Sequence, residues 1–301
     1  MKYLVTGVNG QLGYDVVREL KSRGVTEDDI IAVGHQEMDI TDEACVHRII
    51  TETKPDVVFH NAAYTKVDLA EENPEECYKV NTLGPKYIAE ACKEIGAKLI
   101  YVSTDYVFDG EKDGIYNEMD QPNAQNVYGK TKYLGELNAQ INPKTYIVRV
   151  SWVFGIHGNN FVKTMLRLSE SKESVSVVND QFGSPTYTVD LARLLVEMSE
   201  EEKYEVYHAT NDGFCNWAEY AQYILKDTNT VVQPVSTEEY YQPQYAKAKM
   251  EGKVLKIAAR PKCSKLSKVR LQLNGFQPLP RWEDAVDRFM NELEKEKLLK
   301  R

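Results

Sequence analysis

The sequence predicts an α/β protein with a doubly wound parallel sheet in its first half and a smaller lobe in its second half. Short apolar runs alternate with amphipathic segments through residues 1–150, as successive βα units require. A glycine-rich turn follows the first apolar run directly, and from Phe161 onward the regular alternation ends. We therefore expect a Rossmann-type NAD(P)-binding domain over residues 1–155. A substrate-binding lobe would follow over residues 156–301, with some of its segments returning to the sheet.

The first βα unit carries the clearest local signal. Residues 2–6 form a short apolar run, and Gly7, Gly10 and Gly13 follow at GxxGxxG spacing before an amphipathic pattern that extends to Leu20. Such glycines permit a tight turn and close approach of the backbone to a pyrophosphate, while the helix N-terminus supplies free N–H groups. The pattern predicts a dinucleotide site, with a purely structural turn as the alternative.

The end of the second predicted strand, residues 30–33, bears on the choice of cofactor. NAD-selective sites often place a carboxylate there to hold the ribose 2′-hydroxyl. This chain instead continues into Gly34, His35 and Gln36. That sequence leaves room for a 2′-phosphate, which His35 can help to receive. We expect NADPH as the cofactor, with NADH as the alternative, and place Asp39 near the adenine edge.

Two later strands end in residues that suit a ligand site. A third apolar run over residues 55–61 exits through Ala62 and Ala63, whose small side chains would let a flat cofactor lie over the backbone; tight packing is the alternative. The next run, over residues 97–102, delivers Thr104. Because ligands of doubly wound sheets bind beyond the carboxyl ends of the strands, we expect these segments and the glycine turn to line one site.

Tyr128 and Lys132 are four residues apart, so they share one face of the helix expected to run to about Gln140. A phenol, with a pKa of about 10, is a poor acid near neutrality. A fixed ammonium beside it favours the phenolate and lowers that pKa. The Thr104 hydroxyl could hold the same carbonyl oxygen with which the phenol exchanges its proton. Together the three side chains predict a carbonyl/alcohol redox site, and a chance surface pair of Tyr128 and Lys132 is the alternative. The segment 108–127 reads as a loop crossing the mouth of this site.

Composition excludes several classes of function. The chain has 301 residues and a net charge of -9, which argues against a nucleic-acid or anionic membrane surface as partner. Its beginning has no secretory pattern, and no apolar run approaches the length of a membrane span. The five scattered cysteines suit a reducing compartment, and the five histidines form no zinc pattern. We therefore expect a cytoplasmic protein with no metal ligands identified.

Blocks of sequence along nearly the whole chain resemble, in order, the dTDP-4-dehydrorhamnose reductase family of extended short-chain dehydrogenase/reductases. The blocks are GVNGQLG (7–13), NAA (61–63), STDYVF (103–108), YGKTK (128–132), VRVSWVFG (148–155), GNNF (158–161), NDQFGSPT (179–186), RPKCSKL (260–266) and LPRW (279–282).

The resemblance implies NADPH-dependent reduction of the C4 ketone of dTDP-4-dehydro-β-L-rhamnose to dTDP-L-rhamnose, the final step of dTDP-rhamnose synthesis. It implies that Tyr128 donates the proton, that Lys132 holds the cofactor ribose and lowers the Tyr128 pKa, and that Thr104 polarises the carbonyl. The matched cofactor positions are Gly7, Gly10, Gln11, Leu12, Gly13, Asp39, Ile40, Ala62, Ala63, Tyr64, Tyr128 and Lys132. The matched substrate positions are Thr104, Asp105 and Trp152, and we assign the positive charge of Arg260 to the substrate diphosphate.

Several alternatives stay open at this point. A 4,6-dehydratase is disfavoured, because it needs a second carboxylate after the catalytic threonine and this chain has Tyr106 there. Another NDP-4-keto-6-deoxysugar reductase, a 4-epimerase, or a non-catalytic subunit resembling the regulatory subunit of methionine adenosyltransferase would share the same motifs. The segment 241–259 is longer than the family's usual connection and predicts an extra loop or short helix. The resemblance also allows Mg²⁺, and either a monomer or a homodimer.

Overall fold

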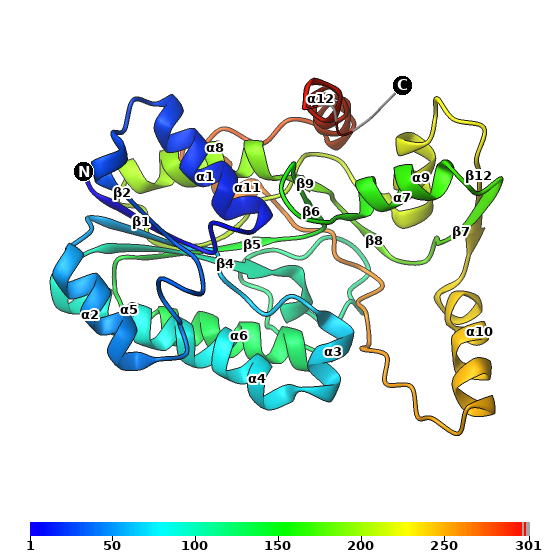
Figure 1. Ribbon diagram of the computed structural model, residues 1–301, viewed down its shortest axis with the longest axis horizontal. Helices are drawn as coiled ribbons and strands as arrows, with labels where there is room; N and C mark the ends of the chain where they lie inside the picture. Colours follow the sequence, from blue (N-terminus) through cyan, green and yellow to red (C-terminus); the bar gives the residue numbers. More distant parts are fainter. Residues whose placement is uncertain (297, 299–301) are drawn as a thin grey trace.

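The computed structural model describes residues 1–296 and 298. Its centre is a six-stranded parallel sheet with the strand order β10-β5-β4-β3-β1-β2 (Figure 1). The chain winds outward from β1 in both directions, so the predicted doubly wound fold is confirmed. The strands are β1 (Tyr3–Thr6), β2 (Ile30–Val33), β3 (Val57–His60), β4 (Lys98–Thr104), β5 (Thr145–Val150) and β10 (Val206–His208).

The sheet is covered by helices on both faces, so its strands are apolar on both sides. In β1, Tyr3 and Val5 pack into the core beneath α1 and α8, while Leu4 points to the core formed with α2 and α5. Figure 1 shows α1 and α8 on one side of the sheet and α2, α5 and α6 on the other. These helices are α1 (Gln11–Ser22), α2 (Glu43–Thr53), α5 (Gly84–Ile95), α6 (Val127–Ala139) and α8 (Thr188–Glu200).

Side-chain caps determine where two of these helices begin. The Asp42 carboxylate accepts a hydrogen bond from Cys45 N at 3.1 Å and starts α2. The Asn126 side chain accepts from Gly129 N at 2.7 Å and starts α6. Because α6 begins just before Tyr128, that residue lies in the first turn of the helix, at the sheet edge where β4 ends.

The helical region between β3 and β4 is interrupted by a wider turn. α3 (Val67–Glu72) and α4 (Pro74–Tyr78) precede a π-helical turn, η2 (Lys79–Leu83), which leads into α5. The turn places the buried Asn81 side chain against Tyr64, where Oδ1 accepts from Tyr64 N at 2.8 Å and Nδ2 donates to Tyr64 O at 3.1 Å. The wider turn therefore serves to hold the chain that leaves β3.

The second half builds its own core from short strand pairs and helices. Aromatic rings dominate it: Phe154 stacks on Tyr187 at 5.3 Å and meets Phe289 edge-on at 5.3 Å. The elements are β6 (Val153–Phe154), α7 (Phe161–Ser169), β7 (Ser174–Val178), β8 (Phe182–Gly183), β9 (Thr186–Tyr187), β11 (Cys215–Asn216), α9 (Trp217–Ile224), β12 (Val231–Val235), α11 (Val269–Leu273) and α12 (Trp282–Lys295). The tail helix predicted over 282–301 is α12; residues 297 and 299–301 lie outside the described residues.

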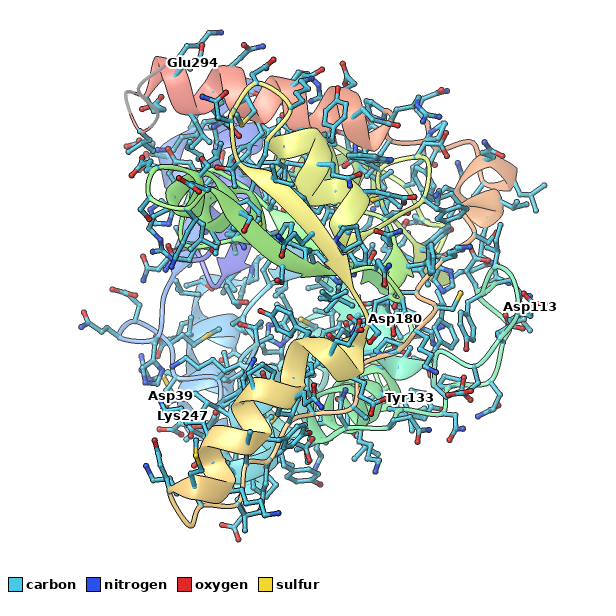
Figure 2. All side chains as sticks on the ribbon, turned by 90° about the vertical axis from the view of Figure 1, so that its right-hand side faces the viewer. Asp39, Asp113, Tyr133, Asp180, Lys247 and Glu294 are labelled. Atoms are coloured by element: carbon cyan, nitrogen blue, oxygen red, sulfur yellow. The ribbon has the colours of Figure 1, made fainter. Side chains whose placement is uncertain are left out.

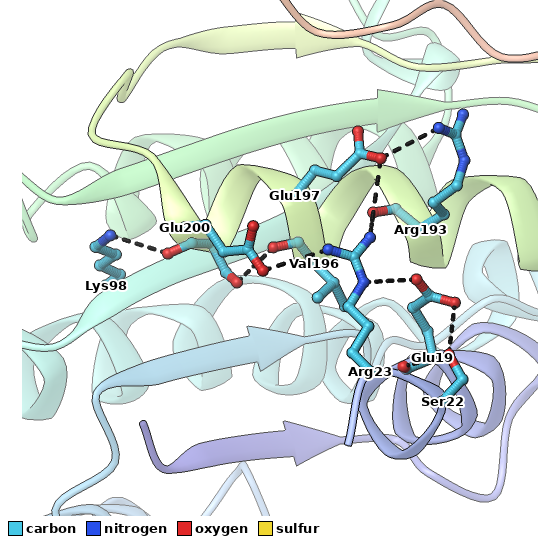
Figure 3. Close-up of polar contacts among 9 residues, drawn as sticks. Glu19, Ser22, Arg23, Lys98, Arg193, Val196, Glu197 and Glu200 are labelled. Atoms are coloured by element: carbon cyan, nitrogen blue, oxygen red, sulfur yellow. Dashed lines mark hydrogen bonds and ion pairs between the residues drawn. The ribbon is translucent and has the colours of Figure 1, made fainter. Parts of the chain in front are cut away.

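Two segments of the second half lie on the sheet of the first. β10 pairs with β5 at one edge, and α8 packs beside α1. Arg23, at the end of α1, joins the two helices by donating to Glu19 at 2.7 Å, to Glu200 at 3.3 Å and to Arg193 O at 3.3 Å (Figure 3). These contacts tie the second half to the helix layer that covers the parallel sheet.

The long segment before Arg260 forms α10 (Thr237–Met250), a helix with no buried residue. Its start is held where Asp180 accepts hydrogen bonds from Thr237 N at 3.1 Å. From there α10 extends along the outside of the molecule, with Lys247 on its outer part (Figure 2). The extra segment predicted from the sequence is thus a projecting helix.

The segment 108–126 is a loop, but it does not cross the mouth of the cavity described below. It packs instead against residues 260–267, where Tyr116 N donates to Lys265 O and Ser267 N donates to Tyr116 O, both at 2.8 Å. A Cβ on Gly110 would lie 2.5 Å from Pro261 Cα, so the two segments meet too closely for any larger residue.

Within the described residues, no helix combines the length and hydrophobicity needed to cross a bilayer.

Candidate active site

A cavity of about 920 Å³ opens at the carboxyl ends of the sheet strands. Its walls are the glycine turn, the exits of β2 and β3, the end of β4, the first turns of α6, residues 150–153 and Trp217. Of the residues predicted to contact cofactor or substrate, all line this cavity except Tyr64 and Arg260. Tyr64 lies just outside, where Asn81 holds its backbone.

The glycine turn has no room for side chains at two of its positions. Gly7 has φ +67°, and a Cβ there would lie 2.9 Å from Ala62 N. A Cβ on Gly13 would lie 2.3 Å from Gly7 O, so helix α1 packs directly on the turn. Gly10 N donates to Gly7 O at 2.9 Å, and Gly10 then starts α1 without a side-chain cap. The free N–H groups of α1 therefore lie at a turn whose backbone a pyrophosphate could approach closely.

The end of the cavity beside β2 contains Asp39 and His35. Burial opposes ionisation of Asp39, but hydrogen bonds from Thr41 N at 2.9 Å and Thr41 Oγ1 at 2.8 Å outweigh it and lower the pKa of the carboxyl. His35 is exposed at the cavity wall, with Nδ1 3.9 Å from Asp39 Oδ1. Glu37, the acid nearest the end of β2, is engaged by Gly34 N at 2.8 Å. The residues directly after β2 are Gly34, His35 and Gln36, so no acidic residue stands at the strand end that NAD-selective sites use.

The exit of β3 is shaped by Thr6. Its hydroxyl accepts from Asn61 N and Ala62 N, both at 3.1 Å, and pairs with His60 Nδ1 at 3.0 Å. Burial lowers the pKa of His60 to about 3, with Lys132 adding to the effect, so the imidazole is neutral. The Asn61 side-chain amide lines the cavity, and its buried oxygen and nitrogen have no hydrogen-bond partner within the described residues. An unpaired buried amide at this point fits a polar ligand group.

Thr104, Asp105 and Tyr128 meet at the end of β4. The Thr104 hydroxyl donates to Asp105 Oδ1 at 3.0 Å and accepts from Tyr106 N at 3.2 Å. Burial raises the pKa of the Tyr128 phenol, although its hydrogen bond with Thr104 acts in the opposite direction. Tyr106 meets the Tyr128 ring edge-on at 5.5 Å. A phenol and a threonine hydroxyl thus face the same part of the cavity.

Lys132 lies one helical turn beyond Tyr128 but turns its ammonium to other partners. Nζ donates to Val102 O at 2.7 Å and sits 4.2 Å from the centre of the Tyr101 ring. Burial lowers the pKa of Lys132 to about 7, with the Glu136 carboxylate opposing the change. The expected lowering of the Tyr128 pKa by Lys132 is not met in this arrangement, because burial dominates at the phenol and the ammonium is directed at Val102 and Tyr101.

A buried ion pair supports this face of the site from behind. The Arg149 guanidinium donates to both carboxylate oxygens of Glu136, at 2.9 and 2.7 Å, and Ser103 Oγ donates to Glu136 at 2.6 Å. All three side chains are buried. The network links α6, which carries Tyr128, to β4, which ends at Thr104, and to β5, which leads to Trp152.

The side of the cavity formed by residues 150–153 and α9 holds two indoles. Trp152 has φ +49°, a left-handed conformation that is strained for a bulky residue, and its ring stacks on Trp217 at 3.8 Å with a 17° interplanar angle. A Cβ on Gly183 would lie 2.9 Å from the Trp152 ring, so glycine is needed behind it. Burial raises the pKa of nearby Asp105 to about 6, against the hydroxyls of Ser264 and Thr104. Asp105 Oδ2 is buried without a hydrogen bond within the described residues.

A family model described as the RmlD substrate binding domain matches residues 1–295. The chain belongs to this family. It is similar to the spore coat polysaccharide biosynthesis protein SpsK of Bacillus subtilis, at 37% identity over 294 residues and 97% of each chain. It is also similar to dTDP-4-dehydrorhamnose reductase of Aggregatibacter actinomycetemcomitans, at 38% identity over 301 residues, which cover 95% of this chain and 97% of the relative.

A solved structure supports the same membership. dTDP-4-dehydrorhamnose reductase from Bacillus anthracis, in complex with NADP, superposes with a TM-score of 0.89 at 40% identity and covers 97% of this chain and 100% of its own. The family inferred from sequence motifs is thereby confirmed.

Two predicted features of the site have no support in the described structure. Arg260 does not line the cavity; its guanidinium pairs with Asp68 of α3 at 3.0 and 2.7 Å, and its centre lies 5.6 Å from the Tyr241 ring. Among the described residues, no group of His, Cys, Asp or Glu side chains is arranged to hold a metal ion, so Mg²⁺ has no candidate site there.

Three features of the site were not predicted from the sequence. Trp217 lines the cavity, the Asn61 side chain is an unpaired polar group, and Gln11 forms a contact between the two halves of the chain. Trp217 belongs to no quoted motif, and only the fold brings it to Trp152. Asn61 stands in the NAA block, so the block could have pointed to its side chain.

Proposed function

We propose that the protein reduces the C4 ketone of dTDP-4-dehydro-β-L-rhamnose to dTDP-L-rhamnose, with NADPH as reductant. The observation that carries this proposal is the pairing of a protonated Tyr128 phenol with the Thr104 hydroxyl at the end of β4, beside a glycine turn that fits a pyrophosphate. Relatives named dTDP-4-dehydrorhamnose reductase provide the sugar, and the NADP complex of one of them provides the cofactor.

NADPH, when bound, supplies the hydride that adds to C4 of the sugar. When the ketone is bound, the Thr104 hydroxyl rotates from Asp105 Oδ1 to donate to the ketone oxygen, and Tyr128 transfers its proton to that oxygen as negative charge develops there. The product is the 4-hydroxyl, and the phenolate regains a proton from solvent. Because burial raises the pKa of Tyr128, the phenol is protonated at neutral pH before each turnover.

The other cavity residues take binding roles in this proposal. Lys132 keeps N–H donors beyond its bond to Val102 O, and they can hold the cofactor ribose hydroxyls. The unpaired Oδ2 of Asp105 accepts from a sugar hydroxyl, and the Trp152 indole, supported by Trp217, offers a flat face to the sugar ring. Tyr106 occupies the position where a dehydratase would need a second carboxylate, which favours ketone reduction over dehydration.

Purified protein is incubated with dTDP-4-dehydro-L-rhamnose and NADPH, and both NADPH consumption and formation of dTDP-L-rhamnose are followed. Tyr128→Phe removes the proton donor, and we expect turnover to fall by roughly 10²- to 10⁴-fold. Tyr133→Phe, on the same helix but outside the cavity, is the matched control and should retain activity. Absence of turnover by the wild-type protein, or full activity of Tyr128→Phe, would overturn the proposal. Substrate conversion without net NADPH consumption would indicate an epimerase instead.

A further inference from the structure

The loop over residues 155–160, from the second half of the chain, lies against the glycine turn. Gly155 N and Asn160 Nδ2 both donate to the side-chain oxygen Oε1 of Gln11, each at 2.9 Å. Beside them, His157 Nδ1 pairs with Asn9 O at 3.0 Å. The segment expected to bind the cofactor pyrophosphate is therefore held by side chains of the other lobe.

Backbone groups fix the orientation of both amides. A backbone N–H can only donate, so Gly155 N requires Gln11 to present its oxygen. Lys163 N in turn donates to Asn160 Oδ1 at 3.0 Å, because Asn160 caps helix α7. The Asn160 nitrogen is left to donate to Gln11 and to Gly155 O, the latter at 2.8 Å. Exchanging oxygen and nitrogen in either amide would break these bonds.

This orientation leaves the Gln11 nitrogen free for a ligand. Gln11 is the first residue of α1 and lines the cavity, and within the described residues its Nε2 has no hydrogen-bond partner. The first turn of α1 contains no acidic residue that would oppose an anion. The two N–H donors of the Gln11 side-chain amide therefore lie beside the free backbone N–H groups at the N-terminus of α1.

We propose that Asn160 is a positioning residue for the cofactor. It holds Gln11 so that the Gln11 amide donates to the pyrophosphate of NADP(H), and the second lobe strengthens cofactor binding without touching the cofactor. This inference rests on the proposed function for the identity of the ligand. Its observable consequence is a cofactor affinity that depends on Asn160 only while Gln11 is present.

The test uses NADP⁺ binding measured by isothermal titration calorimetry, with no sugar present. Asn160→Ser keeps a capping hydroxyl for α7 but is too short to reach Gln11. Because Gly155 N still holds Gln11 Oε1, the substitution should weaken rather than abolish the hydrogen bond from Gln11 to the charged pyrophosphate, and we expect the Kd for NADP⁺ to rise roughly three- to tenfold. In a Gln11→Ala background the same substitution should change the Kd by less than about twofold, because no amide remains to be positioned.

Asn216→Ser provides the matched control. Asn216 also caps a helix of the second half, accepting from Glu219 N at 2.9 Å, and has no contact with Gln11, so the Kd should not change. Thermal unfolding of each variant separates lost affinity from lost fold. An unchanged Kd in Asn160→Ser, or an equal rise in both backgrounds, overturns the positioning role alone. Failure of the wild-type protein to bind NADP⁺ overturns the proposed function and this inference together.

Discussion

Replacing Lys132 with methionine is expected to stabilise the fold while removing activity. Burial lowers the pKa of Lys132 from its ordinary 10.5 to about 7. At about 1.4 kcal/mol for each pH unit, keeping this ammonium charged in the folded state at pH 7 or below costs on the order of 5 kcal/mol. Methionine fills a similar volume without charge. It forfeits the bond to Val102 O and the contact with the Tyr101 ring, so the expected net gain is about 1–4 kcal/mol.

The pH dependence of this gain has a defined sign. Below about pH 7 both folded and unfolded wild-type chains carry the lysine proton, and the destabilisation is fully present. Between about pH 7 and 10.5 the folded chain releases the proton while the unfolded chain keeps it, so the wild-type protein becomes more stable as pH rises. The advantage of Lys132→Met should therefore be largest near pH 6 and smaller at pH 9.

Urea unfolding of the two proteins at both pH values measures this difference. Lys130→Met serves as control, because Lys130 is exposed on the same helix and its replacement should change the free energy of unfolding by less than about 0.5 kcal/mol. Turnover of Lys132→Met should fall by roughly 10²-fold or more if the ammonium holds the cofactor ribose. A methionine variant that is less stable at pH 6, or whose stability difference does not vary with pH, would refute the reasoning.

Two further substitutions test buried charges near the site. Burial raises the pKa of Asp105 from 3.8 to about 6, so wild-type stability should fall by on the order of 3 kcal/mol as pH rises through that interval, and Asp105→Asn should remove the fall. Urea midpoints at pH 4 and pH 7 measure it, and a difference that stays constant would contradict it. Glu136→Gln leaves the buried Arg149 charge without its partner and should destabilise the fold by about 3–5 kcal/mol, whereas Glu90→Gln in an exposed pair should cost less than about 1 kcal/mol. Equal unfolding midpoints for these two variants would show that the buried pair contributes nothing.

The fold was predictable because its signals are local. The strands β1, β2 and β4 follow from the apolar runs at residues 2–6, 30–33 and 97–102, each of which is read from a few neighbouring residues. The π-helical turn before α5 could not be predicted in this way. It depends on Asn81 meeting the backbone of Tyr64, a contact formed only after β3 and α6 have placed the two segments together.

The residues of the candidate site could be proposed from the sequence, whereas the side-chain contacts between distant residues could not. Thr104, Tyr128, Lys132 and the glycine turn each follow a strand or open a helix, so the rule that ligands bind at strand carboxyl ends brings them together. Arg260 carries the charge that a diphosphate needs, yet it pairs with Asp68, which lies 192 residues away in sequence. Gln11 and Asn160 likewise stand in two separate motifs, and neither motif indicates that they touch.

Tyr128 and Lys132 show why spacing along a helix does not determine electrostatics. A separation of four residues places two side chains on one face, but it says nothing about the dielectric around them or the partners to which they turn. The same burial that raises the pKa of the phenol lowers the pKa of the ammonium. A phenol that stays protonated at neutral pH is the state that ketone reduction requires at the start of turnover, whereas alcohol oxidation would require the phenolate. Burial therefore keeps Tyr128 in the protonated form that donates to a ketone, which is the opposite of the pKa lowering that the spacing first suggested.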